Sequence, residues 1–118
     1  MYMIYLASPY SHDIAAVRKR RAVAACMATG KLTDDGECVF SPIATSHTLL
    51  QVCSRPWNDP WWYEWSMGFL RHAGQVWVLM LDGWKESRGV QAEIEEAKRL
   101  GIFIRYVAPE TVEMLDEP

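Results

Sequence analysis

Short apolar runs alternate with longer helical patterns along the chain. Four of the runs predict β-strands, because each is rich in β-branched or aromatic residues and ends near Pro, Gly or Asp. These runs cover residues 2–7, 38–42, 75–81 and 102–107. The third run, QVWVLML, is hydrophobic throughout, which is typical of a central parallel strand that is covered on both faces.

Helical patterns separate these runs. They cover roughly residues 12–30, roughly residues 60–73 and the segment between Ser87 and Gly101, and Pro109 is expected to begin a short C-terminal helix. Asp13 is the predicted N-cap of the first helix and Gly30 its predicted end. Asp59 and Pro60 predict the start of the second helix, because Pro is favoured at the first helical position after a cap. Residues 43–60 show the least regular pattern.

This order of elements predicts an α/β fold. The 118 residues fit one domain, residues 1–118, with a mostly parallel sheet of four to five strands and helices on both faces, a three-layer α/β/α arrangement. Ligands of such sheets bind beyond the carboxyl ends of the strands. That rule selects three loops as candidate ligand-binding segments: Ser8–His12, Ser41–His47 and Asp82–Gly89.

Composition narrows the function classes. The net charge of −3 argues against a nucleic-acid binder, which would need a basic face, and no apolar run reaches the length of a membrane span. The basic cluster Arg18–Arg21 is interpreted as a solvated helix face. Three cysteines without a CxxC pair are expected to be reduced, partly buried thiols, and neither a disulfide framework nor a metal site nor a cofactor is expected. With no recognisable signal peptide, a cytoplasmic location is expected.

One glutamate of the helix after Ser87 is out of place. At about 100° per residue, Val90, Ile94 and Ala97 define an inner apolar stripe, and Glu93 falls inside that stripe. A buried carboxylate needs a partner or a function. Glu93 is therefore either a boundary residue that finds a hydroxyl partner or a nucleophile or base beside a helix N-terminus, where Ser87 and Gly89 would suit an anion.

Two motifs carry a family resemblance. The segments IYLASPYS, at the first strand, and ESRGVQAEIEEAKRLG, after the third, resemble the nucleoside 2-deoxyribosyltransferase superfamily, and in particular its small uncharacterised branch with YLAxPYSH and GWxxSRGVxxE patterns. The resemblance covers most of the chain. It implies a flavodoxin-like order of elements.

The resemblance also implies roles for individual residues. The family's glutamate, which attacks the anomeric carbon of a 2-deoxyribosyl group, matches Glu93, and the tyrosine that orients it matches Tyr5. The loop that contacts sugar or phosphate matches Ser8, Pro9, Tyr10 and Ser11. The implied mechanism is double displacement through a glycosyl-enzyme ester, as in retaining glycosidases.

Ser87 favours a nucleotide over a free nucleoside as substrate. Relatives that act on nucleosides tend to carry an aspartate at this position, whereas relatives that hydrolyse nucleoside 5′-monophosphates carry a serine. An N-cap serine can donate to a phosphate that an aspartate would repel. Arg88 could add positive charge or face solvent.

The acid that would protonate the departing base is missing from its usual places. Ser66 and Gly74 occupy the positions where relatives commonly carry aspartates, so Asp59, Glu64 and Asp82 are the remaining candidates. His12 and His47 follow strand ends and could bind phosphate or base, or be structural. Three tryptophans (Trp57, Trp61 and Trp62) suit a core, a subunit interface or stacking on a nucleobase.

The sequence therefore predicts an enzyme that cleaves or transfers the N-glycosidic bond of a (deoxy)nucleoside 5′-monophosphate or nucleoside. The alternative is a non-catalytic nucleotide-binding or sensing module on the same fold, which the missing acids favour. The expected partners are a small-molecule nucleotide or nucleoside and further copies of the chain in a dimer or tetramer, with no nucleic acid and no membrane.

Overall fold

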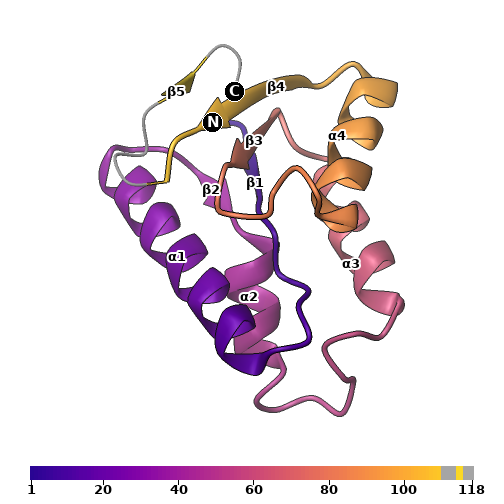
Figure 1. Cartoon of the computed structure of the whole chain (residues 1–118). Coiled ribbons are helices and arrows are strands. Elements are labelled where there is room, and N and C mark those ends of the chain that lie inside the picture. The colour runs from indigo at the N-terminus through magenta and orange to yellow at the C-terminus, as the bar shows by residue number, and fades with distance from the viewer. Residues whose placement is uncertain (110–113, 116–118) are drawn as a thin grey trace.

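The computed structural model describes residues 1–109 and 114–115. Within them, five strands form one sheet in the order β2-β1-β3-β4-β5 (Figure 1). The first four strands are parallel, and β5 pairs antiparallel with β4. The strands are β1 (Ile4–Ala7), β2 (Val39–Phe40), β3 (Gln75–Leu79), β4 (Phe103–Val107) and β5 (Met114–Leu115). The predicted α/β fold with a mostly parallel sheet is confirmed.

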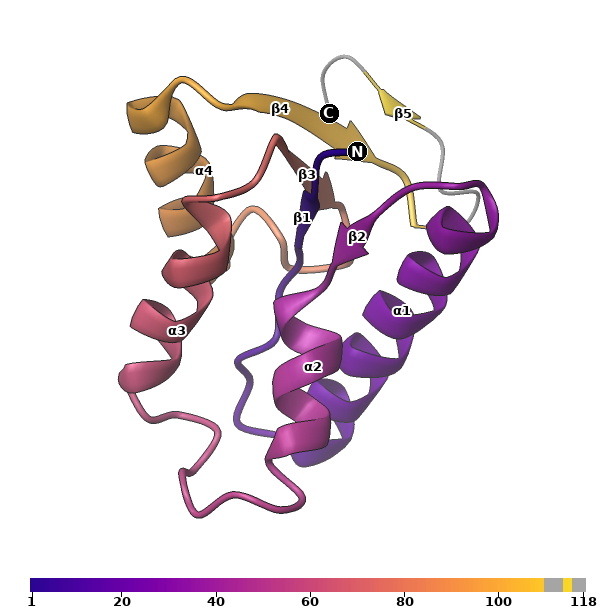
Figure 2. The same cartoon turned by 180° about the vertical axis from the view of Figure 1, so that it is seen from behind.

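Alternate residues of the central strands serve two separate cores. Tyr5, Ala7 and Val76 face a cluster that α3 (Trp61–Leu70) and α4 (Arg88–Leu100) complete. Ile4, Leu6 and Trp77 face the other cluster, which α1 (Ala15–Asp34) covers. Figures 1 and 2 show α3 and α4 together on one side of the sheet and α1 on the other. Successive residues of β1 and β3 point to opposite faces of the sheet, and helices cover both faces. Both strands are therefore hydrophobic along their whole length.

Helix α1 differs from its predicted bounds at both ends. Asp13 is not the cap: Ile14 occupies the N-cap position without a side-chain cap, and the ring of His12 accepts a hydrogen bond from the Ile14 amide at 3.0 Å. Gly30 does not end the helix, which continues to Asp34 and closes before Gly36 at a φ of +93°. A glycine inside a helix lowers its stability by only about 1 kcal/mol, which the packed Leu32 turn beyond it offsets.

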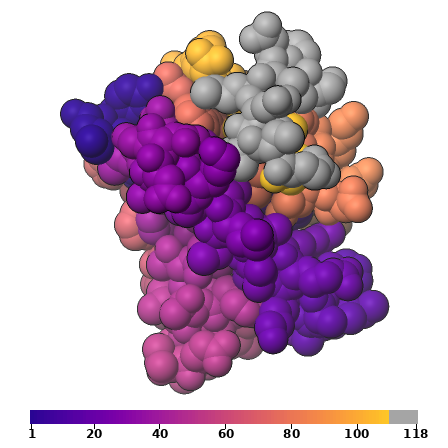
Figure 3. Space-filling model, turned by 90° about the vertical axis from the view of Figure 1, so that its left-hand side faces the viewer, coloured from indigo at the N-terminus to yellow at the C-terminus, as the bar shows by residue number. Residues whose placement is uncertain are grey.

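The segment after β2 contains a helix that the sequence pattern missed. The predicted strand at 38–42 is reduced to Val39–Phe40, and α2 (Pro42–Leu49) begins directly after it. Ser41 is its N-cap and accepts a hydrogen bond from the Ala44 amide at 3.1 Å. Helices α1 and α2 pack against each other and occupy much of the face shown in Figure 3.

The remaining helices agree more closely with expectation. Helix α4 has Ser87 as N-cap and Gly101, at a φ of +71°, as C-cap, as predicted. Helix α3 begins one residue later than predicted, with Pro60 at the N-cap position, while an Asp59 oxygen accepts from the Trp61 amide at 2.9 Å. The predicted helix after Pro109 is wrong at Met114–Leu115, which form β5, and its other residues lie outside the described part of the chain.

The structure also bears on the expectations for the cysteines and for membrane-spanning helices. The three cysteines are free, but all three are exposed, not partly buried. None of the helices in residues 1–109 is long and apolar enough to cross a membrane.

Candidate active site

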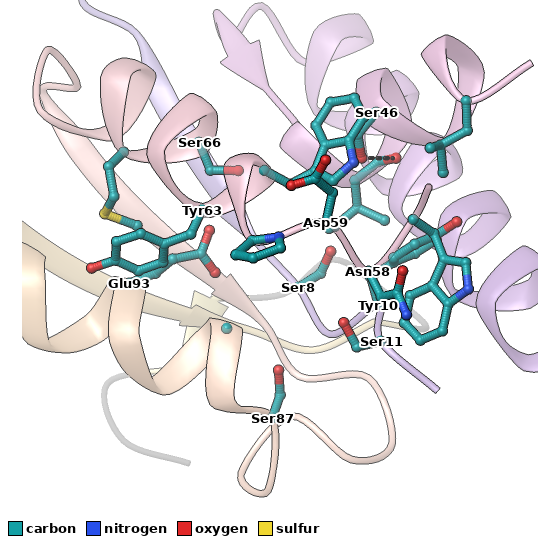
Figure 4. Close-up of a pocket in the computed structure, with 17 residues that line it drawn as sticks. Ser8, Tyr10, Ser11, Ser46, Asn58, Asp59, Tyr63, Ser66, Ser87 and Glu93 are labelled. Atoms are coloured by element: carbon teal, nitrogen blue, oxygen red, sulfur yellow. Dashed lines mark hydrogen bonds between the residues drawn. The ribbon is translucent and has the colours of Figure 1, made fainter. Parts of the chain in front are cut away.

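A cavity of about 220 Å³ lies beyond the carboxyl ends of β1 and β3 (Figure 4). The loop after β1, helix α2, the segment before α3, helix α3 and the start of α4 all contribute to its walls. Because parallel strands end at the same edge of the sheet, their loops converge there. Its lining residues from the predicted set are Ser8, Tyr10, Ser11, Asp59, Ser87, Gly89 and Glu93.

Glu93 reaches the cavity from the second turn of α4. Only 7% of the residue is exposed, which confirms its predicted place on the inner face of the helix. Its carboxyl group accepts a hydrogen bond from the hydroxyl of Tyr5, a fully buried residue of β1 that lies behind the cavity wall. Strand β1 thus fixes the position of the Glu93 oxygens, and Tyr5 itself does not line the cavity.

Burial controls the protonation of this pair. Removal from water raises the pKa of Glu93 to about 8, although the hydrogen bond from Tyr5 lowers it. Burial, followed by the neighbouring Glu93 charge, raises the pKa of Tyr5 well above its usual range. Tyr5 therefore remains a hydrogen-bond donor over the whole physiological pH range.

Ser8 is the one described buried residue with a side-chain oxygen that lacks a partner. It follows β1, is 4% exposed and lines the cavity. Figure 4 shows its hydroxyl pointing into the space that Glu93, Asp59 and Ser66 also face. A buried hydroxyl without a hydrogen bond is unfavourable, so this position fits a polar atom of a ligand.

The N-terminus of α4 forms the lower wall in Figure 4. The Ser87 oxygen accepts from the Val90 amide at 3.2 Å, which leaves its hydroxyl hydrogen to donate to a ligand. Gly89 also lines the cavity, and a Cβ at this position would have only the Ser87 oxygen within 4 Å. Arg88 is exposed and does not line the cavity.

The three candidate acids occupy different surroundings. Glu64 and Asp82 are exposed and lie outside the cavity walls. Asp59 lines the cavity, but one of its oxygens accepts from the Trp61 amide and the other pairs with Arg55 at 3.3 Å. Both oxygens of Asp59 are therefore already engaged.

Of the two positions where relatives carry aspartates, only one faces the cavity. Ser66 of α3 lines it close to Glu93 (Figure 4). Gly74 is packed beneath Tyr2, whose side-chain atoms would lie 2.5–2.7 Å from any added Cβ. A larger residue at position 74 would therefore displace the N-terminal segment.

A second cavity of about 300 Å³ adjoins the first and shares Tyr10, Leu50 and Trp57 with it. The Tyr10 hydroxyl and a ring nitrogen of His47 are 2.9 Å apart at this junction. The charged residues of its wall are Arg18 and Arg55. His47 therefore belongs to the second cavity and contacts the first only through Tyr10.

Two members of the basic cluster support the site, so its interpretation as a solvated face holds only in part. Arg18 donates to the His12 carbonyl and stacks on Trp57 at 4.2 Å. Arg21 donates to the carbonyls of Ser11 and Asp82 at 3.0 and 3.3 Å, and so joins the loops after β1 and β3. Lys19 and Arg20, between them in sequence, are exposed as expected.

Gly83 makes room for the Arg21 contact. Its φ is +90°, and a Cβ there would lie 2.5 Å from the Arg21 guanidinium. Only glycine combines this backbone conformation with that approach. Position 83 is therefore coupled to the geometry of the two loops that carry Tyr10, Ser11 and Ser87.

The remaining residues divide into those the structure places elsewhere and those the sequence did not indicate. Pro9 is buried behind the wall, the His12 ring accepts a hydrogen bond from the Ile14 amide, and Trp61 is exposed beneath Arg55. Ile43 and Ser46 line the cavity from the predicted segment Ser41–His47, and the lining residues outside the predicted segments are Leu50, Asn58, Pro60, Tyr63 and Met67. The helical state of residues 42–49 was not predicted, and its signal was the Ser41-Pro42 pair, a favoured N-cap and first-position combination. No group of three or more His, Cys, Asp or Glu side chains in the described residues is arranged to hold a metal.

Comparisons with known proteins place this geometry in context. Residues 2–107 match the family model described as Domain of unknown function (DUF1937). A solved structure of a 2-deoxyribosyltransferase from the psychrotolerant bacterium Bacillus psychrosaccharolyticus shares the fold with a TM-score of 0.63 and 21% sequence identity. The match covers 91% of this chain and 72% of that protein. The sequence has no significant match among curated proteins.

Proposed function

We propose that this chain, which belongs to the DUF1937 family, cleaves or transfers the N-glycosidic bond of a nucleoside or nucleoside 5′-monophosphate, with Glu93 as nucleophile. The observation that carries the proposal is the placement of Glu93: a buried carboxyl group, oriented by Tyr5, at the wall of a cavity beside a helix N-terminus. A residue with a perturbed pKa in a cleft is typical of a functional site. The shared fold with a 2-deoxyribosyltransferase supports the same reaction class.

In the proposed reaction, a Glu93 oxygen forms a bond to C1′ as the bond from C1′ to the base nitrogen breaks. The electron pair of the broken bond departs with the base. Water, or a second base in a transfer reaction, then attacks C1′, Glu93 leaves as carboxylate, and the proton that the attacking group loses ends on the released base. In this scheme Ser8 and Ser87 hydrogen-bond the sugar, and the 5′ group has two candidate sites, the N-terminus of α4 and the adjoining cavity lined by Arg18 and Arg55.

The competing function is nucleotide binding without chemistry. It is favoured by Asp59, the one carboxyl group besides Glu93 on the described wall, because both of its oxygens are already engaged. A binding module, however, does not need a buried carboxyl group, whose burial disfavours the charged form.

Base release separates the two functions. The protein is incubated with each nucleoside and 2′-deoxynucleoside 5′-monophosphate, and free base is measured by chromatography. We expect Glu93→Gln to lower the rate at least about 1,000-fold. The matched control is Glu95→Gln, the same substitution at an exposed site of the same helix. Tight binding without Glu93-dependent release would instead establish the binding module.

The proposal also includes the domain organisation, the oligomeric state and the cellular location. We infer a single domain over residues 1–118 that acts as a dimer or tetramer in the cytoplasm. Self-association is supported by three exposed aromatic residues on α3: Trp61, Tyr63 and Phe69. The three free cysteines fit a reducing compartment.

A further inference from the structure

The wall of the first cavity carries acids but no bases. Its lining residues include two carboxyl groups, Glu93 and Asp59, and neither a lysine nor an arginine. Arg55 balances Asp59, which leaves Glu93 as the carboxyl group that no described cation pairs with. A ligand that brings positive charge meets no like charge on this wall and stabilises the ionised form of Glu93.

Aromatic rings form much of the same wall. Trp57, Trp62, Tyr10 and Tyr63 all line the cavity, and Tyr63 lies beside Glu93 in Figure 4. The face of an aromatic ring attracts cations, most strongly where water is excluded. Rings and carboxyl groups together thus suit a flat cationic group better than a neutral one.

The state of Asp59 points the same way. A neutral nucleobase is a poor leaving group and departs readily only when an acid protonates it. The oxygens of Asp59 are held by Arg55 and by the Trp61 amide, and Ser66 provides a hydroxyl where an acid would serve. A base that already carries a positive charge requires no proton, because the electron pair of the broken bond neutralises it.

Building on the proposed function, we propose that the substrate is a nucleoside or nucleotide whose base carries a fixed positive charge, such as an N-glycosylated pyridinium or an N7-alkylated purine. Glu93 forms the bond to C1′, and the ring nitrogen takes the electron pair and leaves as a neutral base. Water then resolves the ester, placing its hydroxyl on C1′ and leaving its proton on the Glu93 carboxyl group, which returns the site to its starting state. No oxidant, reductant or acid is needed.

The adjoining cavity completes the charge pattern. Arg18 donates to carbonyl oxygens, stacks on the Trp57 ring and lies close to the Tyr10 hydroxyl. Burial raises the pKa of Tyr10, and the Arg18 charge partly offsets this rise. Arg18 and Arg55 line this cavity together with His47. Such a wall suits phosphate. An acidic aromatic cavity that opens onto a basic one fits a zwitterionic nucleotide, with a cationic base and an anionic phosphate.

Binding such a cation would also activate the nucleophile. Because burial raises the pKa of Glu93 to about 8, the empty site holds it mainly protonated at neutral pH. The groups that face Glu93 are Tyr5 from β1 and, across the cavity, Tyr63 and Asp59. A cation placed beside the carboxyl group lowers its pKa, so the proton is released when the substrate binds.

The decisive comparison uses pairs that differ by one methyl group. Guanosine and 7-methylguanosine, and their 5′-monophosphates, are incubated with the protein, and nicotinamide mononucleotide provides the pyridinium case. Each rate is divided by the rate in buffer, because methylation itself weakens the glycosidic bond. We expect the enhancement for the methylated compounds to exceed that for the parent compounds at least about 100-fold. Glu93→Gln should abolish it, and Glu95→Gln should leave it unchanged.

A binding measurement gives a readout without turnover. We expect the 1-methylnicotinamide cation to bind at least about fivefold more tightly than neutral nicotinamide. Its binding should release a proton, detected by calorimetry, and this release should be absent in Glu93→Gln. Tyr63→Leu, at an exposed position, should remove most of the preference.

The outcomes separate this inference from the proposed function. Equal enhancement of parent and methylated compounds, dependent on Glu93, would overturn the cationic substrate and leave the glycosidic reaction in place. No Glu93-dependent release from any compound would overturn both. A monophosphate preferred over its nucleoside, with that preference lost in Arg18→Met, would support phosphate in the second cavity.

Discussion

The hydroxyl of Tyr5, in the first strand, donates a hydrogen bond to the carboxyl group of Glu93, 88 residues later in α4. This contact crosses from the sheet to the helix that covers it, and it aims one buried acid at the cavity. The chemistry of the site and part of the pH dependence of the fold both follow from this pair.

The burial of Glu93 predicts that the protein loses stability as pH rises. The pKa of the group is about 8 in the folded state and 4.5 when unperturbed, so the folded state binds the extra proton between these values. Its contribution is fully present below pH 4.5 and is lost as pH rises through about 8. Glu93→Gln cannot ionise, so we expect it to exceed the parent by up to about 5 kcal/mol in free energy of unfolding above that pH.

Urea denaturation at about pH 5, 7 and 9 measures this difference. Glu95→Gln is the control, because Glu95 is exposed and its replacement should give no comparable increase with pH. A constant gap between Glu93→Gln and the parent at all three pH values would contradict the buried, protonated state.

Tyr5→Phe should move the pH profile of base release to higher pH. The Tyr5 hydrogen bond lowers the pKa of Glu93, so its removal raises that pKa further and leaves less of the ionised nucleophile at neutral pH. We expect the rate at about pH 7 to fall roughly 10- to 100-fold, with partial recovery in alkaline buffer. An unshifted profile with a uniformly lower rate would show that Tyr5 acts only through packing.

Arg21→Met and Gly83→Ala should weaken the same contact. Arg21 joins the loops after β1 and β3, and a Cβ at Gly83 would displace its guanidinium. We expect each variant to raise KM severalfold with a smaller change in kcat, because both loops carry residues of the cavity wall. The free-energy loss of the double variant, calculated from kcat/KM, should be smaller than the sum of the two single losses. The difference, the coupling energy, should be about 0.5–3 kcal/mol. Arg20→Met, exposed on the same helix, is the control, and strict additivity would exclude the coupling.

Ser66→Asp should place an acid where the cavity has a hydroxyl. Ser66 lines the wall near Glu93, so a carboxyl group there can protonate a neutral base. We expect release from guanosine to increase at least about tenfold relative to release from 7-methylguanosine. Gly74→Asp should instead destabilise the fold against Tyr2 and give no such gain. A Ser66→Asp variant with an unchanged ratio would show that proton supply does not limit the neutral substrate.

The sequence predicted best where one local rule dominated. The amphipathic period of residues 88–100 placed Glu93 on the inner face, and Ser87 and Gly101 marked the ends of α4. The sequence-based prediction of helix bounds failed where tertiary packing overrode the local preference of the residues. Gly30 lies within α1 because the helix continues to a buried Leu32, and α2 was missed because residues 42–49 show no clear stripe.

The site could be predicted only in part for a similar reason. Strand ends indicated the three loops, and Ser41–His47, most of which lies in α2, does contribute to the cavity. No pattern in the sequence brings residues 57–63 to the same cavity. Arg18 and Arg21 looked like a solvated charge cluster because their partners are backbone carbonyls, which carry no sequence signal. The antiparallel pairing of β5 with β4 was also not indicated, because the pattern predicted a helix after Pro109.

Because the Ser8 hydroxyl has no partner among the described residues, the thermal stability of a complex should depend on how the bound ligand is oriented. A ligand that supplies a hydrogen-bonding atom at this point gives the hydroxyl a partner that the described residues do not provide, and a ligand that fills the space without such an atom leaves it unpaired at a cost of about 1–3 kcal/mol. Two analogues that fill the same space but differ at that atom should therefore separate in a melting experiment. Their difference should vanish in Ser8→Ala, which gives a way to map the pose of a bound sugar before any complex is crystallised.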